Sequence, residues 1–156
     1  MAIYKNAAQL EVESHFPKLK RRPYVITSSK SPIYNCTALD AGEIHQWWEY
    51  DATTSLGVQT YWPPGFPPGD TVADVSNVFQ AVFHYGPTTD RRARPGFEKV
   101  ALYGYEDGGF AHIARQLRSG RWSSKLCELY DLEHALSDLE GRVYGRVAAI
   151  LERVQP

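Results

Sequence analysis

Cysteine and histidine are the residue types of this 156-residue chain that are best suited to nucleophilic chemistry. Cys36 follows Asn35, which can cap a short helical run that begins there. A thiol at a helix N-terminus is stabilised as the thiolate by free backbone N–H groups and by the helix dipole. An imidazole must then take the thiol proton and later protonate the leaving group. These residues make Cys36 a candidate nucleophile that would pair with a histidine, and by themselves they leave a buried structural thiol as the alternative.

The spacing of several short motifs selects His112 and indicates a family. Pro-Tyr-Val at 23–25 precedes Tyr-Asn-Cys-Thr-Ala-Leu at 34–39, with Tyr24 twelve positions before Cys36. Pro-Gly-Phe-Glu-Lys-Val-Ala-Leu-Tyr at 95–103 is followed by His-Ile-Ala-Arg-Gln-Leu-Arg-Ser-Gly-Arg-Trp at 112–122. In this order and at these spacings, the motifs resemble those of the NlpC/P60 cysteine peptidases.

The resemblance implies an α+β, papain-like fold in which a nucleophile helix packs on an antiparallel β-sheet. It implies that His112 is the base and then the acid, and that the Tyr24 hydroxyl helps to hold the oxyanion. The third polar residue of that family comes twelve positions after the histidine, which here is Ser124. A two-residue turn at Ser119-Gly120 would instead place Ser123 and Lys125 on the face of His112. The family spacing favours Ser124 as the residue that orients His112, and Tyr24 as a core tyrosine stays open.

A closer resemblance is to small bacterial proteins without an assigned activity. They share Tyr-Asn-Cys, His-x-Ala-Arg-Gln-Leu, Gly-Arg-Trp-x-Ser-Lys-Leu and a later Asp-x-Glu-His with this chain. The chain departs from the peptidases in having Asn35 where they have Asp. It also has Ser28-Ser29 where they commonly have Gly-Gly, and an insertion at approximately 43–94. The resemblance therefore predicts the architecture and leaves the substrate open.

The insertion is rich in aromatic residues and proline. Trp and Tyr are typical of binding surfaces because they combine apolar area with a polar edge. Four of them are candidates to line a substrate groove beside Cys36, or else to cap the core: Trp47, Trp48, Tyr61 and Trp62.

Hydrophobic periodicity and turn residues predict the elements that must position these side chains. We expect helices at 6–16 with Asn6 as cap, at 71–85 with Asp70 as cap, and at 131–140 with Asp131 as cap. His134 would then be a partly exposed histidine on a helix surface. We expect strands at 24–27, 99–105, 110–117 and 121–126, and favour a strand for the tail 143–151.

Composition limits the remaining possibilities. The length predicts one domain over 1–156. A formal net charge of -1 argues against a nucleic-acid or anionic-membrane binder, and no apolar run is long enough to span a membrane. Two cysteines, Cys36 and Cys127, fit a reducing compartment, and the start is not a signal peptide. We expect a cytoplasmic protein, or one exported without a signal peptide.

No motif for a metal or a phosphate-binding loop is present, so no cofactor is expected. The predicted function is a thiol-dependent amide hydrolase: a peptidase, amidase or deamidase, with acyl transfer also open and an effector or toxin role conceivable. Its substrate would be a peptide, protein or peptidoglycan-like amide. The alternatives are a non-catalytic papain-like module that binds a peptide or glycan through the aromatic loop, and a partner-binding regulator. The sequence sets no oligomeric state.

Overall fold

The computed structural model describes residues 5–28, 47–48, 60–61, 63–67, 69–126 and 130–155. Several residues of interest lie outside this part of the chain, namely Cys36 with its expected helix, Trp62 and Cys127. For Trp47, Trp48 and Tyr61 only the backbone is described. It forms a separate parallel pair, β2 (Trp47–Trp48) with β3 (Thr60–Tyr61).

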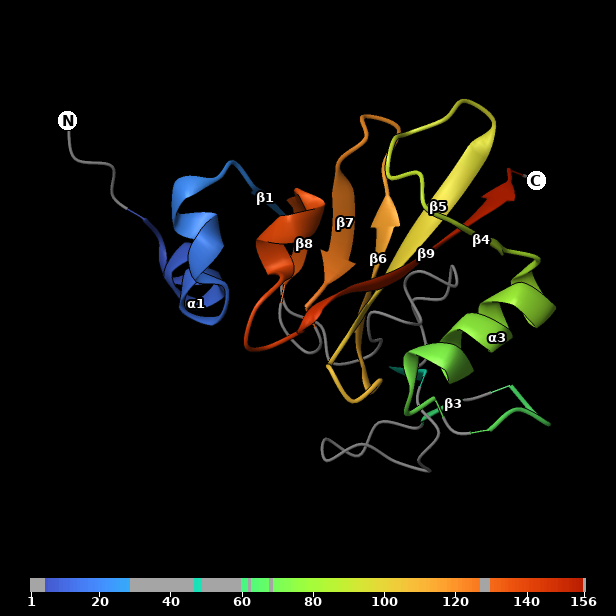
Figure 1. Ribbon diagram of the computed structural model, residues 1–156. Helices are drawn as coiled ribbons and strands as arrows, with labels where there is room; N and C mark the ends of the chain where they lie inside the picture. Colours follow the sequence, from blue (N-terminus) through green and yellow to red (C-terminus); the bar gives the residue numbers. More distant parts are fainter. Residues whose placement is uncertain are drawn as a thin grey trace.

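The fold is α+β, as expected, and is built on one seven-stranded antiparallel sheet (Figure 1). The strand order is β1-β8-β7-β6-β5-β9-β4, so that β6 lies in the centre. The strands are β1 (Val25–Ser28), β4 (Gly86–Thr88), β5 (Phe97–Gly104), β6 (Phe110–Gln116), β7 (Trp122–Lys125), β8 (Asp131–His134) and β9 (Arg146–Val154). The strands expected at 24–27, 99–105, 110–117, 121–126 and in the tail are all present.

Helix α1 (Ala7–His15) forms where the capping pattern predicts it. The Asn6 side chain accepts a hydrogen bond from the Gln9 backbone N–H at 2.9 Å, and the Gln9 side chain accepts one from the Asn6 N–H at 2.9 Å. This reciprocal capping box satisfies two N–H groups that would otherwise lack a partner at the helix start. Pro17 then begins the 3-10 helix η1 (Pro17–Arg21).

Helix α3 (Val72–Phe83) is shorter than the predicted 71–85, and its cap is Thr71 rather than Asp70. The Thr71 hydroxyl accepts from the Asp74 N–H at 3.1 Å. The carbonyl of Asp70 instead accepts from the Phe110 N–H at 2.9 Å, which ties the helix start to β6. Both α3 and β4 lie within the predicted insertion, yet β4 pairs with β9 in the main sheet.

The turn between β6 and β7 differs from the predicted two-residue hairpin. The Leu117 N–H bonds to the Arg121 carbonyl at 2.8 Å, so that three residues form the loop, and Gly120 takes a positive φ of 91°. The extra residue moves the register by one and pairs Arg115 with Ser123. Because neighbouring residues of a strand point to opposite faces, Ser124 comes to the face of His112.

The prediction of a helix at 131–140 is wrong. Asp131–His134 is the strand β8, and only Leu136–Leu139 is helical, as the 3-10 turn η2. β8 pairs with both β7 and β1, and these ladders prevail over the local helical period. His134 is therefore fully buried in the sheet instead of lying on a helix surface.

Each face of the sheet carries its own hydrophobic core. On one face, α3 packs on β5, β6 and β9 through a cluster of Val75, Phe79, Tyr85, Val100, Leu102, Ile113 and Leu151. On the other face, α1, η1 and η2 cover residues that include Tyr103, Ala114 and Trp122. Figure 1 shows α3 beside β4 and β9, and α1 near β1 and β8. Among the described helices, none is long and apolar enough to cross a membrane.

Candidate functional site

His112 lies on the central strand β6 and is fully buried. It pairs across the sheet with Tyr103 of β5, and the two ring centroids are 5.4 Å apart. On its other side it stacks on Tyr144, with centroids 4.1 Å apart and planes 3° apart. The Tyr103 hydroxyl donates to the Leu136 carbonyl at 2.5 Å. Packing of aromatic rings therefore holds the imidazole in place.

Neither ring nitrogen of His112 has a hydrogen-bond partner among the described residues. Burial, with a smaller contribution from nearby His134, holds the pKa of His112 well below its usual range. The ring is therefore neutral at pH 7 and has an unused acceptor nitrogen. A buried polar group without a partner costs about 1–3 kcal/mol, so such a group in a native core calls for an explanation.

Ser124 and His134 form a hydrogen-bonded pair on the same face of the sheet. The His134 Nδ1 lies 2.8 Å from the Ala135 carbonyl, which can only accept, so Nδ1 carries the proton. The Nε2 of the neutral ring is then an acceptor, and the Ser124 hydroxyl donates to it at 2.7 Å. Burial and the charge of Arg121 lower the pKa of His134 to about 4, against the hydrogen bond to Ala135.

The structure brings His112 and Ser124 to one face of neighbouring strands, but the hydrogen bond of Ser124 goes to His134. Both Ser124 and His134 are fully buried. His134 is the residue that the sequence reasoning missed. The alternation in Asp131-Leu132-Glu133-His134 puts Leu132 and His134 on one face of a strand, and this period-two pattern could have identified it.

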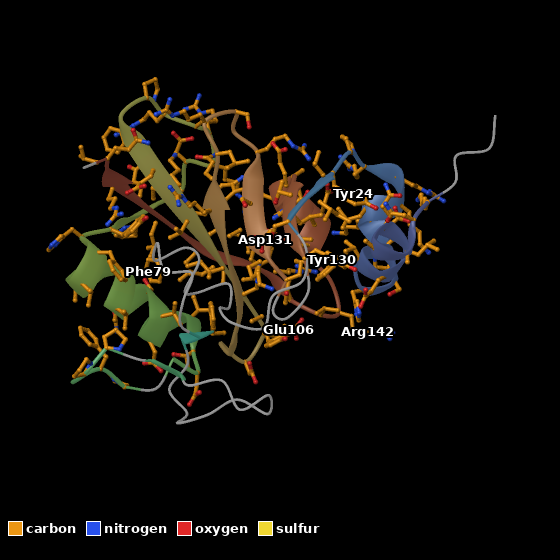
Figure 2. The ribbon with its side chains drawn as sticks, turned by 180° about the vertical axis from the view of Figure 1, so that it is seen from behind. Tyr24, Phe79, Glu106, Tyr130, Asp131 and Arg142 are labelled. Atoms are coloured by element: carbon orange, nitrogen blue, oxygen red, sulfur yellow. The ribbon has the colours of Figure 1, made fainter. Side chains whose placement is uncertain are left out.

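Tyr24 is placed elsewhere, just before β1. Its hydroxyl donates to Glu13 of α1 at 2.7 Å, and Figure 2 shows it between β1 and α1. Burial and Glu13 raise the pKa of Tyr24 above its ordinary value. The Glu13 carboxylate also accepts hydrogen bonds from the Lys5 ammonium, at 2.6 and 2.8 Å. In this structure the Tyr24 hydroxyl thus serves to link α1 to the sheet.

The arrangement around His112 suits proton transfer. A neutral imidazole with a free acceptor nitrogen can take a proton from a thiol or a water molecule that reaches it. Within the part of the chain that the structure describes, no group of three His, Cys, Asp or Glu side chains is placed to hold a metal ion.

Comparison with known proteins places the chain in a family. No curated protein and no solved structure matches it. A family model with the description "Domain of unknown function (DUF7689)" matches residues 25–152. That range begins at the first residue of β1 and extends into β9, so it includes His112, Ser124 and His134. The chain therefore belongs to the DUF7689 family.

Proposed function

We propose that this protein is a thiol-dependent amide hydrolase with a papain-like fold of the NlpC/P60 type. The single observation that carries the proposal is the buried, neutral imidazole of His112 with no hydrogen-bond partner among the described residues. An imidazole retained in a core at this free-energy cost is accounted for if another group uses it. The motif spacing identifies that group as the Cys36 thiol.

The position of His112 in the sheet supports the proposal. It lies on β6 between β5 and β7, in the hairpin that resembles the histidine-bearing hairpin of the peptidases. Ser124 lies on the adjacent strand at the family spacing and on the same face. Ser124 is bonded to His134 in this structure, so its proposed role of orienting His112 requires that its hydroxyl leave His134.

In the proposed reaction, His112 takes the proton of Cys36, and the sulfur attacks the carbonyl carbon of an amide. The backbone N–H of Cys36 holds the oxyanion, and Tyr24 assists it only if its hydroxyl leaves Glu13. His112 then protonates the departing amine, and water hydrolyses the thioester. The substrate is a peptide, protein or peptidoglycan-like amide. His112 is fully buried, with Tyr144 stacked on its ring. The reaction therefore also requires that the residues over the ring move, so that the thiol and the substrate can reach it.

Thiol labelling tests the proposal. In a Cys127→Ser background, alkylation of Cys36 by iodoacetamide is measured at pH 6 against a free thiol. An ordinary thiol of pKa about 8.5 is about 0.3% ionised at this pH, so a fully ionised thiolate should react up to about 300-fold faster. His112→Ala should remove the excess rate, and His15→Ala, at an exposed histidine, should not. If Cys36 reacts like the free thiol and His112→Ala changes nothing, the proposal fails.

The complete burial of His112 beneath Tyr144 favours a second candidate, a non-catalytic module that binds a peptide or glycan. In that case His112 is a core residue and the binding surface lies elsewhere. This candidate predicts slow alkylation of Cys36, together with ligand binding that is insensitive to Cys36→Ala.

A further inference from the structure

A hollow of about 840 Å³ lies at one end of the main sheet. It is bounded by the loop before β5, the end of β6, the β6–β7 turn and the residue after β9. Figure 1 shows the loop before β5 and the β6–β7 turn at the same end of the sheet. Arg115 of β6 and Ser123 of β7, which line it, are a cross-strand pair on the face opposite His112. The hollow is therefore separate from the site described above.

The lining is cationic, although the whole chain has a formal net charge of -1. It includes four cations and the carboxylate of Glu98; the cations are Arg94, Lys99, Arg115 and Arg118. Glu98 is already bonded to Arg153. The excess positive charge is thus local, and its effect depends on which of these cations are still unpaired.

Lys99 does not contribute to that excess. It is 1% exposed, and its ammonium donates to the Asp90 carbonyl at 2.6 Å. The carboxylates of Asp90 and Glu152 each lie 3.6 Å from the same nitrogen. Two acidic groups therefore neutralise this lysine and hold the loop that carries Asp90 against β5 and β9.

Arg115 and Arg118 have no acidic partner within the part of the chain that the structure describes. Both side chains are exposed and line the hollow, and neither makes an ion pair or a side-chain hydrogen bond with any described residue. The Ser123 hydroxyl beside them also has no such partner. Two guanidinium groups and one hydroxyl thus line one space, and no described residue uses their donors.

The hollow also has an apolar side. The guanidinium of Arg94 lies over the Phe97 ring, 3.7 Å from its centroid, and one of its nitrogens is 4.0 Å from Glu152. Phe97, Pro95 and Leu117 add apolar surface to the lining. The volume lies in the range of small-molecule sites, which combine apolar walls with a few polar groups that fix orientation. A space of this kind suits an organic anion better than a bare ion.

We propose that this hollow, which we call the Arg115–Arg118 site, binds an organic anion that presents a carboxylate or a phosphate group to the two arginines. The planar guanidinium group matches both oxyanions through paired N–H donors, and these charge-assisted hydrogen bonds are the strong ones. The Ser123 hydroxyl supplies a further donor. The site makes no use of Cys36 or His112, so it stands independently of the proposed hydrolase activity.

The test is an NMR titration of the full-length protein with three short peptides: Ala-Glu-Glu-Ala, Ala-pSer-pSer-Ala and the uncharged Ala-Gln-Gln-Ala. At least one acidic peptide should shift the amide signals of 115–118 and 123, and the uncharged peptide should not. The peptide that binds more tightly identifies carboxylate or phosphate as the preferred group. Binding should weaken as salt is added, because the interaction is between exposed charges.

Arg115→Ala and Arg118→Ala should each weaken binding about tenfold. The matched control is Arg142→Ala, an exposed arginine that Figure 2 labels near α1, away from the hollow. It should leave the dissociation constant unchanged, as should Cys36→Ala. If neither acidic peptide binds, or if Arg142→Ala weakens binding as much as Arg115→Ala, the proposed site is overturned.

Discussion

The imidazole of His112 lies flat against the ring of Tyr144, with ring centroids 4.1 Å apart. Tyr144 comes from the loop between η2 and β9, so the stack joins two segments that are distant in the chain. The stack fixes the ring plane without using either ring nitrogen. His134, on β8 and on the same face of the sheet, is held by two hydrogen bonds instead. The two buried histidines should therefore respond differently to the same substitution.

Replacement of each histidine by leucine tests this difference. His112→Leu removes two nitrogens that have no partner among the described residues and keeps an apolar group, so the free energy of unfolding at pH 7.5 should stay unchanged or rise by about 1 kcal/mol. His134→Leu leaves the buried Ser124 hydroxyl without its partner and should lower the free energy of unfolding by about 2 kcal/mol. Chemical denaturation measures both values. Equal losses in the two variants would show that His112 has a structural partner after all.

Acid should destabilise the protein through these histidines. Their ordinary pKa is 6.5, and in the fold it is about 4 for His134 and well below the ordinary value for His112. The unfolded chain therefore binds protons that the folded chain does not. The stabilisation is fully present above about pH 6.5 and is lost as the pH falls, by up to about 1.4 kcal/mol per pH unit for each histidine. For His134 the loss ends near pH 4.

Urea unfolding at several pH values between 7.5 and 4.5 measures the slope of the free energy of unfolding against pH. His112→Leu should reduce the slope by about half, because it removes one of the two histidines whose pKa is lowered among the described residues. His15→Ala, which removes an exposed histidine, is the control. A slope that His112→Leu leaves unchanged would contradict the prediction.

Tyr24→Phe should weaken the attachment of α1 to the sheet. The substitution removes the hydrogen bond to the buried Glu13 carboxylate, and Lys5 then remains as the residue bonded to it. The free energy of unfolding should fall by about 1–2 kcal/mol, as for hydrogen bonds to charged groups. The matched control is Tyr105→Phe, in which a half-exposed tyrosine loses a bond to the Val143 carbonyl. Similar losses in both variants would argue against a special role for the Glu13 contact.

Gly145 should be intolerant of a side chain. It has a φ of +69°, and a Cβ there would lie 2.1 Å from the Gly104 carbonyl oxygen on β5. Gly145→Ala should therefore cost about 3 kcal/mol or more, because strain and a backbone clash add together. Gly108 also has a positive φ, of 89°, but a Cβ there would lie in open space. Gly108→Ala should therefore cost only about 1 kcal/mol. Thermal denaturation of the two variants provides the comparison.

The sequence by itself was sufficient for elements that depend on neighbours in the chain. The capping box of Asn6 and Gln9 involves residues three apart, and the helix of Val75, Val78 and Phe79 follows from apolar spacing. The strands β5 and β6 were also predictable. In each case the determining interaction is local, or the pattern repeats within one element.

Only the tertiary structure decided which strands pair and in which register, because a local sequence pattern does not determine either. Asp131–His134 has a helical period with the residues after it, but it becomes a strand because β1 and β7 supply hydrogen bonds from both sides. Likewise, one added residue in the turn at Gly120 moved Ser124 to the face of His112. Register and pairing are set by contacts between segments far apart in the chain. The neutral state of His112, and the lack of a hydrogen-bond partner for it among the described residues, follow from the same long-range packing, because burial beside Tyr103 and Tyr144 keeps water from its ring.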